Sequence, residues 1–318
     1  MKILANDGID ASAKTALESK GFTIETNKVA QADLPSHIND YDVLLVRSAT
    51  KVTKEIFDAA PNLKLVGRAG VGLDNIDTAY AKEKGVAVVN TPAASSTSVA
   101  ELVFAHMFSV CRLLQYTNRE MPTNGIEKFN DLKKTASAGV ELKGKTLGLI
   151  GFGRIGREAA RMAYGLGMNV IAFDPMITEA DVEITFHADA GIPTIKKSVK
   201  TISKEEVLKN ADFVSLHIPG GQGYVIAAAE LAMMKKGAGL INCARGGVVS
   251  EADLIAALQS GHIAYAGTDV FEKEPPVNDA ILKLDNVSLS PHIGASTAEA
   301  QKRIGDEMAD QIINFFNK

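Results

Sequence analysis

Short apolar runs alternate with amphipathic stretches along the first part of the chain. β-branched residues are concentrated in MKILAND (1–7), DVLLVRSA (42–49), LKLVGRAG (63–70) and VAVVNTP (86–92), and a helical pattern that ends near Gly21 follows the first run. Strands that alternate with helical patterns are typical of a parallel sheet covered by helices. The pattern therefore predicts an α/β domain in this part of the chain.

A second alternating series follows a polar segment from about Pro122 to Lys143. Its six predicted strands are GKTLGLIGFGRIG, MNVIAFDP, ADFVSLHIP, GLINCARG, HIAYAGTDV and NVSLSP. The predicted fold class is therefore α/β, with two Rossmann- or flavodoxin-like doubly wound parallel-sheet domains and a cleft between them.

Three further segments have a predicted structure. Residues 97–119 are mostly apolar, can be capped by Ser96 or Thr97, and predict one long buried helix between the domains. The final amphipathic segment, TAEAQKRIGDEMADQIINFFNK, predicts a helix that packs back on the first domain. Between Asp174 and Asp212 the chain is longer than one crossover requires, so we predict one helix (SKEEVLKNA) and an excursion without assignment.

Composition removes several classes of function. Of the 318 residues, 46% are hydrophobic and 23% charged, and the net charge is −4, which argues against nucleic acid or an anionic membrane as a partner. Cys111 and Cys243 are far apart and form no metal-binding motif, so no metal is expected. Without a long apolar leader or an uncharged apolar run of membrane-spanning length, a cytoplasmic protein is expected.

Gly151, Gly153 and Gly156 form a GxGxxG motif between an apolar run and a helical pattern. Glycines at these positions permit a tight turn and the close approach of a pyrophosphate to a helix N-terminus, and Arg154 adds a positive charge. Asp174 follows 18 residues after Gly156, where a carboxylate can bind ribose hydroxyls and repel a 2′-phosphate. The set predicts NAD rather than NADP. The alternative is a glycine turn at an ordinary strand–helix corner, with Asp174 capping a strand end.

Three residues with suitable chemistry follow later strands: Arg245 in INCARGG, Glu274 in DVFEKEPP and His292 in SPHIGAS. Strand carboxyl ends face the ligand crevice of an open α/β sheet. These residue types suit a 2-hydroxy acid. An arginine can bind its carboxylate through two hydrogen bonds, and a histidine can exchange the proton of its hydroxyl group. A glutamate beside the histidine favours the protonated form of the ring. The alternatives are a surface turn for the arginine and a structural role for the histidine, and Glu272 competes with Glu274.

Two other histidines and one cysteine are less suited to catalysis. His106 lies in the apolar helical segment and His217 at a strand end, and for both we predict core packing or a contact at the edge of the cofactor. Cys243 is expected to contact the cofactor at most.

Through GFGRIG with Asp174, INCARGG, DVFEKEPP and PHIGAS, the chain resembles the D-isomer-specific 2-hydroxyacid dehydrogenase family over essentially its full length. The resemblance implies a discontinuous substrate-binding domain (1–96 plus 291–318) and an NAD-binding Rossmann domain (97–290). It implies that Arg245 anchors the substrate, that Glu274 pairs with His292, and that His292 is the acid/base. The cofactor-binding residues that it implies are Val71, Gly151, Gly153, Arg154, Ile155, Gly156, Asp174, Pro219, Cys243, Ala244, Arg245, Asp269, His292, Gly294 and Ala295.

Within the family, RSATKVT, GRAGVGLDNID and PHIGASTAEAQ look most like the phosphoglycerate dehydrogenases, which implies 3-phosphoglycerate as the substrate. The substrate-binding residues are then Arg47, Ser48, Gly70, Val71, Arg245 and His292, and Lys51 adds a charge near the phosphate. The resemblance also implies a homodimer with residues 97–119 and neighbouring segments at its interface. Because the chain ends with the returning helix, inhibition by serine through an appended domain is not expected.

Two alternatives to this substrate remain open. The first is another enzyme of the family that reduces hydroxypyruvate, glyoxylate or pyruvate, because the fold and the three catalytic residues do not select the substrate's tail. The second is an NAD(H)-sensing binding protein that resembles the corepressors related to this family. One departure from the family pattern is HIPGGQGYV, which lacks the threonine that the family usually has after its HxP, close to the predicted cofactor contact at Pro219.

Overall fold

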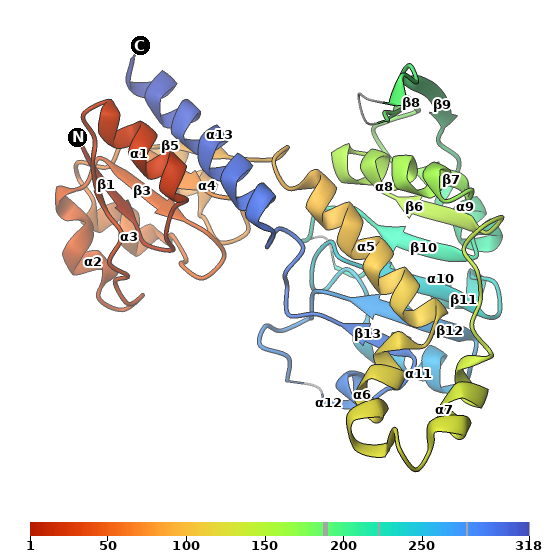
Figure 1. The fold of residues 1–318 in the computed structure, drawn as a ribbon. Helices are drawn as coiled ribbons and strands as arrows, with labels where there is room; N and C mark the ends of the chain where they lie inside the picture. Colours follow the sequence, from red (N-terminus) through yellow and green to blue (C-terminus); the bar gives the residue numbers. More distant parts are fainter. Residues whose placement is uncertain (187–189, 222, 278, 318) are drawn as a thin grey trace. The chain divides into compact units, whose positions relative to one another are not determined.

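The computed structural model describes residues 1–186, 190–221, 223–277 and 279–317, and it divides into two compact units (Figure 1). One unit comprises Met1–Ser98 with Ala295–Lys318, and the other comprises Val99–Gly294. Each unit contains a parallel sheet with helices on both faces. The predicted α/β class with two doubly wound sheets is therefore confirmed.

The sheet of the first unit has the strand order β2-β1-β3-β4-β5. Its parallel strands are β1 (Lys2–Ala5), β2 (Thr23–Glu25), β3 (Val43–Val46), β4 (Leu65–Arg68) and β5 (Ala87–Asn90). This is the flavodoxin-like order. The apolar pattern did not reveal β2, because this three-residue edge strand has no fully buried position.

Successive residues of β3 alternate between two cores, as the two-residue period of a strand requires. Val43 and Leu45 face α1 (Ala11–Ser19) and α13 (Ala298–Phe316), whereas Leu44 and Val46 face the opposite helices. These are α2 (Leu34–His37), the short helix η1 (Ile38–Asp40), α3 (Lys54–Ala59) and α4 (Thr78–Glu83).

The final helix packs on α1 within the same unit, as the amphipathic pattern predicts. A Cβ on Gly305 would lie 2.7 Å from Cβ of Asp10 and 3.1 Å from Cβ of Ala13, so glycine allows the two helices to approach closely. Ser12 Oγ also donates a hydrogen bond to Asp306 Oδ1 (2.8 Å). The C-terminal segment thus completes the core of a domain whose other elements are N-terminal.

The sheet of the second unit has the order β13-β12-β11-β10-β6-β7 in the described part of the chain. Its strands are β6 (Thr146–Ile150), β7 (Asn169–Phe173), β10 (Phe213–Leu216), β11 (Ala238–Asn242), β12 (Ile263–Thr268) and β13 (Val287–Leu289). They are the six predicted strands. Thr201 forms a parallel bridge with Ala172 on the edge strand β7, where the third strand of a Rossmann half would pair.

Helices cover both faces of this second sheet. One core contains α5 (Ser96–Cys111) and α8 (Arg154–Gly165), and the other contains α9 (Lys204–Asn210), α10 (Ala228–Met233), α11 (Glu251–Gln259) and the short α12 (Asp279–Leu282). Phe213 and Val214, adjacent on β10, point to the first and the second core.

The single long helix predicted over residues 97–119 is wrong. The chain forms α5 and then α6 (Leu114–Asn124), because Leu113 has a left-handed φ of 54° that interrupts the helix. A further helix, α7 (Phe129–Ala136), lies in the polar segment, for which the apolar pattern predicts no helix.

In the described residues, no single helix has the length and hydropathy to cross a membrane. The pair α5 and α6 reaches that length and composition together, but with a bend of 61° between them.

The connection between Asp174 and Asp212 contains an antiparallel hairpin that the sequence pattern did not reveal. It consists of β8 (Glu179–Ile184) and β9 (Ile195–Lys200), and residues 187–189 at its tip lie outside the described residues. Within the two strands themselves, only Val182 and Val199 are buried, and they join the core that contains α8. With one inward residue per strand, the hairpin lacks the alternating apolar pattern that would have predicted it. The predicted helix SKEEVLKNA is α9, which begins with a capping box formed by Ser203 and Glu206.

Candidate active site

The glycine-rich turn connects β6 to α8 and leaves the start of that helix open. Gly151 has a φ of 98°, and a Cβ there would lie 2.4 Å from the carbonyl oxygen of His217. A Cβ on Gly156 would lie 2.3 Å from the oxygen of Gly151, whereas one on Gly153 would meet open space. No side chain in the described part of the chain caps α8 at Gly153. The turn therefore presents free backbone N–H groups and positive helix-dipole charge, which fit a dinucleotide pyrophosphate.

Asp174 lies at the carboxyl end of β7, beside the glycine-rich turn. Its carboxylate accepts hydrogen bonds from the backbone N–H of Phe152 (2.8 Å), Met176 (2.8 Å) and Ile177 (3.0 Å). The side chain therefore does cap the strand end, as the alternative interpretation expected. An ionised carboxylate has about four acceptor positions, so one remains for a ribose hydroxyl.

Arg245 lies on the loop after β11, and Asn242 fixes this loop. Asn242 Oδ1 accepts from the N–H of Ala244 (3.1 Å), and its Nδ2 donates to the carbonyl of Arg245 (3.1 Å). A Cβ on Gly246 would lie 1.8 Å from the carbonyl oxygen of Phe271, so glycine lets the loop after β12 pass directly beside the arginine loop. Arg245 itself is partly buried, and its Nη1 donates to the carbonyl of Ala244 (2.7 Å).

Glu274 and His292 form a hydrogen-bonded pair. Nδ1 of His292 lies 2.7 Å from Oε2 of Glu274, and each side chain is 38% exposed. The contact leaves the other ring nitrogen, Nε2, to meet a ligand. His292 has a φ of 55°, a left-handed conformation that costs a non-glycine residue about 1–2 kcal/mol. Surrounding contacts must therefore hold this residue in place.

Asp269 makes those contacts. Its backbone carbonyl accepts from the N–H of His292 (2.8 Å), while its carboxylate accepts from the N–H groups of Ile293 and Gly294 (2.8 Å each) and from Ser290 Oγ (2.6 Å). The side chain is buried, so these hydrogen bonds replace the water that a charged group loses on folding. Asp269 thereby clamps the backbone on which His292 lies.

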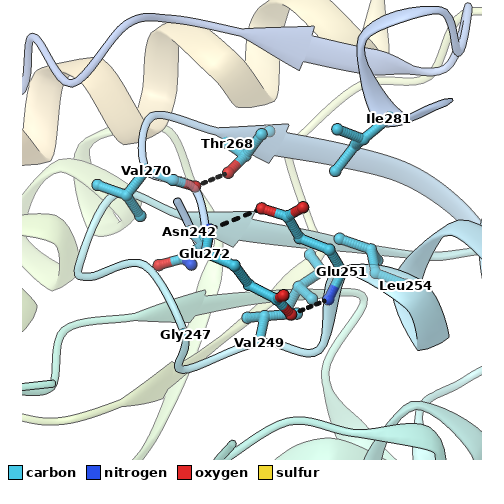
Figure 2. Close-up of a pocket in the computed structure, with 11 residues that line it drawn as sticks. Asn242, Gly247, Val249, Glu251, Leu254, Thr268, Val270, Glu272 and Ile281 are labelled. Atoms are coloured by element: carbon cyan, nitrogen blue, oxygen red, sulfur yellow. Dashed lines mark hydrogen bonds between the residues drawn. The ribbon is translucent and has the colours of Figure 1, made fainter. Parts of the chain in front are cut away.

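Glu272, the competitor of Glu274, has a different set of partners. Its Oε1 accepts from the backbone N–H of Glu251 (2.9 Å), and Glu251 Oε1 accepts from the N–H of Glu272 (2.7 Å). Figure 2 shows this reciprocal contact beside a small cavity of about 10 Å³. The hydroxyl of Tyr224 also donates a hydrogen bond to Glu272, which raises the pKa of Tyr224. Glu272 therefore fixes the loop that carries Glu274 and does not pair with His292.

The pair borders a larger hollow of about 460 Å³. Its lining is mostly apolar and consists of Phe271, Glu274, Pro275, Pro276, Leu282, Leu289, Ser290, Pro291 and His292. A site in the usual size range for small molecules thus has two titratable side chains in its wall.

The predicted residues of the first unit lie at the carboxyl ends of β3 and β4. Asp7 Oδ2 accepts from the N–H groups of Arg47 (2.7 Å) and Thr50 (3.1 Å), so the RSAT segment, including Ser48, has a fixed backbone. Gly70 and Val71 are fixed in turn, because their carbonyls accept from Thr91 N–H (3.0 Å) and Asn90 Nδ2 (2.5 Å).

The remaining predicted cofactor residues lie on the same loops. Arg154 and Ile155 begin α8, Cys243 and Ala244 are buried in the arginine loop, and Ala295 follows Gly294. Pro219 is exposed in the HIPGGQGYV segment, of which Gln222 lies outside the described residues. Burial raises the pKa of the Cys243 thiol well above its usual range. Within the described ranges, no three His, Cys, Asp or Glu side chains are grouped as a metal ion requires.

The comparisons with known proteins agree with this geometry. Residues 104–294 match the model of the D-isomer specific 2-hydroxyacid dehydrogenase NAD-binding domain. The chain is 41% identical to the hydroxypyruvate reductase of Thermotoga maritima, covering 98% of this chain and 97% of that protein. It is also 41% identical to the D-3-phosphoglycerate dehydrogenase of Methanocaldococcus jannaschii, with 98% and 57% covered, so it spans little more than half of that relative.

A solved structure shares the fold. The holo form of Rhodotorula graminis D-mandelate dehydrogenase has a TM-score of 0.84 and 27% identity, with 99% of this chain and 93% of that chain covered. The chain belongs to the D-isomer specific 2-hydroxyacid dehydrogenase family, and it is an NAD-dependent enzyme of that family.

Sequence patterns missed several residues that support the site. Asn242, Glu251 and Ser290 are ordinary polar residues at strand or helix ends, and only their partners show what they do. Ser290 lies 21 positions from Asp269, so no local pattern reveals that contact.

His217 makes the stability of the protein depend on pH. The ring lies under the glycine-rich turn, with Nε2 3.1 Å from Ser215 Oγ, and burial lowers its pKa from about 6.5 to about 4. Between these values the unfolded chain binds a proton that the folded chain excludes, so stability falls as the pH drops from about 6.5 to about 4. We expect this histidine to account for a loss of roughly 3 kcal/mol over that range.

Urea unfolding at pH 7.5 and pH 5 measures this effect. His217→Gln, which keeps a nitrogen near Ser215, should lose less stability on acidification than the parent, whereas the exposed His37→Gln should match the parent. Equal pH dependence in the parent and His217→Gln would contradict the assignment.

Proposed function

We propose that the protein catalyses NAD-dependent oxidation of D-3-phosphoglycerate to 3-phosphohydroxypyruvate, the first step of L-serine biosynthesis. The main support is the hydrogen-bonded pair of His292 and Glu274, which follows β13 and β12, next to Arg245 after the adjacent strand β11. This is the arrangement in which the carboxyl ends of parallel strands carry a site. The unit of residues 99–294 is then the NAD-binding domain and the other unit the substrate-binding domain, close to the predicted division at 97 and 291.

In this proposal Arg245 binds the C1 carboxylate, since a guanidinium stays charged and can form two parallel hydrogen bonds with it. Nε2 of His292 takes the proton of the C2 hydroxyl as the carbonyl forms, and Glu274 stabilises the imidazolium through Nδ1. NAD⁺, when bound, accepts the hydride that leaves C2. In the reverse direction the imidazolium returns the proton to the new hydroxyl.

The phosphate of the substrate is the part of the proposal that distinguishes it within the family. Arg47 and Lys51 are cations of the RSATKVT segment, whose backbone Asp7 and Gln31 fix by hydrogen bonds. Together with Ser48 they offer the charge and the donors that a phosphate needs. Gly70 and Val71 contribute backbone groups to substrate binding.

Reduction of hydroxypyruvate is the second candidate. The Thermotoga maritima protein with that name matches this chain over 97% of its own length, at the same 41% identity as the phosphoglycerate dehydrogenase relative. A substrate without phosphate would leave Arg47 and Lys51 without a role in binding.

We also propose a homodimer. Large apolar side chains are exposed on α5, α6 and α7 and on the segment between α6 and α7: Phe108, Leu114, Met121, Ile126 and Phe129. Ile126 is 98% exposed. Exposed apolar side chains on consecutive elements are typical of surfaces that another protein chain covers. Phe108 and Leu114 lie within residues 97–119, and the others lie in the neighbouring segments of the predicted interface.

Substrate preference tests the proposed function directly. NADH oxidation by the purified protein should give a kcat/KM at least about tenfold higher with phosphohydroxypyruvate than with hydroxypyruvate, because the phosphate gains charge-assisted hydrogen bonds. Arg47→Gln should remove most of this preference, and Lys64→Gln, a surface cation paired with Asp42 in the same unit, should not. Higher kcat/KM with hydroxypyruvate would favour the second candidate, and glyoxylate and pyruvate complete the series.

Substitution of the pair tests the acid/base assignment. His292→Ala should lower kcat by about 10²–10⁴, the usual contribution of a general acid or base, while the Kd for NADH changes less than about twofold. Glu274→Gln keeps a hydrogen-bond acceptor but removes the charge, and it should lower kcat less than His292→Ala. An equal loss of NADH binding and kcat in His292→Ala would show that the ring acts on the cofactor instead.

The ribose contact is tested at Asp174. Asp174→Ala should lower the ratio of kcat/KM for NAD over NADP by about tenfold or more, because a carboxylate there repels the 2′-phosphate. Asp174→Asn keeps an acceptor for the N–H of Phe152 and so controls for loss of the turn. If both variants retain the parent's preference for NAD, the ribose is recognised elsewhere.

A further inference from the structure

His106 is buried between two serines of another element. The ring lies on α5 and is 3% exposed; its Nδ1 is 2.8 Å from Ser288 Oγ, and its Nε2 is 2.9 Å from Ser290 Oγ. Ser288 belongs to β13, and Ser290 is the second residue before His292. A buried histidine thus lies next to the segment that carries the proposed acid/base.

The direction of each hydrogen bond follows from the number of protons available. Ser290 donates its one hydroxyl hydrogen to Asp269 Oδ1 (2.6 Å), so at the histidine its oxygen can only accept. Nε2 of His106 therefore carries the ring proton, and Nδ1 accepts the hydroxyl hydrogen of Ser288. Burial lowers the pKa of His106, which keeps the ring neutral as this chain of bonds requires, although the charge of Asp269 opposes that shift.

The chain of hydrogen bonds ends on the clamp that fixes His292. The carboxylate of Asp269 holds the N–H groups of Ile293 and Gly294, and Ser290 binds the same oxygen, Oδ1, that holds Ile293. The N–H of Ser290 is in turn held by the carbonyl of Thr268 (3.0 Å). The hydroxyl group of Ser290 therefore links His106 to Asp269, and a substitution of His106 would alter the hydrogen bond that Asp269 receives.

The residues around His106 leave space for its ring and pair both of its nitrogens, so the ring does more than fill space in the core. A Cβ on Gly267 of β12 would lie 2.6 Å from Cβ of His106 and 3.0 Å from its Cγ, so glycine makes room for the ring. An apolar residue on α5 would cost nothing in desolvation, whereas a buried imidazole costs free energy unless both nitrogens are paired. Both are paired here, and one pair leads to the carboxylate that fixes the 292–294 backbone.

We propose that His106 is a positioning residue for His292: through Ser290 it fixes the carboxylate of Asp269, which keeps His292 in its left-handed conformation and within hydrogen-bond distance of Glu274. This inference rests on the proposed role of His292 as the acid/base. It assigns the buried histidine to the orientation of the catalytic ring, with no contact to the substrate.

Four variants test the proposal. His106→Leu removes both hydrogen bonds, Ser290→Ala removes the link to Asp269, and His106→Gln can still donate from an amide nitrogen to Ser290. Val103→Ala is the matched control, since Val103 is fully buried on the same helix but outside the hydrogen-bonded chain. Each variant is compared by thermal unfolding, so that kinetic effects are judged at known stability.

Steady-state kinetics in the direction of NADH oxidation separate positioning from packing. His106→Leu and Ser290→Ala should lower kcat about tenfold with KM changed less than about twofold. Ser290→Ala removes a hydrogen bond to the Asp269 carboxylate, and His106→Leu removes the bond that orients the Ser290 hydroxyl, so each loosens the backbone of His292 without touching the substrate. His106→Gln should recover kcat to within about twofold of the parent. A kcat unchanged in His106→Leu, an equal loss in Val103→Ala, or no recovery in His106→Gln would overturn the proposal.

Amide hydrogen exchange gives a readout that does not need turnover. The N–H groups of Ile293 and Gly294 should exchange about tenfold faster in His106→Leu and Ser290→Ala than in the parent, and at the parent's rate in Val103→Ala. Unchanged exchange in the first two variants would overturn the positioning role. Should the parent protein reduce no 2-oxo acid, the proposed function fails by itself, and the exchange rates still decide whether His106 holds this backbone.

Discussion

The parallel sheet of residues 99–294 imposes the constraint on which the rest of the site depends. Because β11, β12 and β13 are neighbours and run in the same direction, the loops that follow them emerge at one edge. Arg245, Glu274 and His292 each lie on one of these loops, although the last two are 18 positions apart in the chain. The sheet brings the loops together, and the loops themselves need little regular structure.

Backbone contacts then give each loop one conformation. Asn242 fixes the arginine loop, Glu251 and Glu272 hold each other's backbone N–H (Figure 2), and Asp269 clamps residues 292–294. These partners are carboxylates or amides that accept hydrogen bonds from the main chain, which are stronger when the acceptor is charged.

The glycine-rich turn and the pair of His292 and Glu274 have their backbone conformations fixed in opposite ways. At the start of α8, glycines remove side chains so that the backbone can approach a phosphate, and one carboxylate, Asp174, closes the turn. At His292 a full side chain is held in a left-handed conformation, so a buried carboxylate has to offset the strain. The glycines form a motif that can be recognised in the sequence. The contacts between Asp269 and residues 292–294 join distant positions and form no local motif.

The sequence by itself determined the fold class, NAD as the cofactor and the family, and it predicted ten of the eleven strands that the described residues form in the two sheets. It could do so because apolar periodicity, glycine spacing and motifs such as INCARGG act over a few neighbouring residues. Only the tertiary structure decided the break at Leu113, the β8–β9 hairpin, the partner of Glu272 and the link from His106 to Asp269. The break depends on one residue with a left-handed backbone, Leu113, and the hairpin is held to the core by two buried valines. The last two join residues 21 to 184 positions apart, which contact one another only because the sheet and its helices place them side by side.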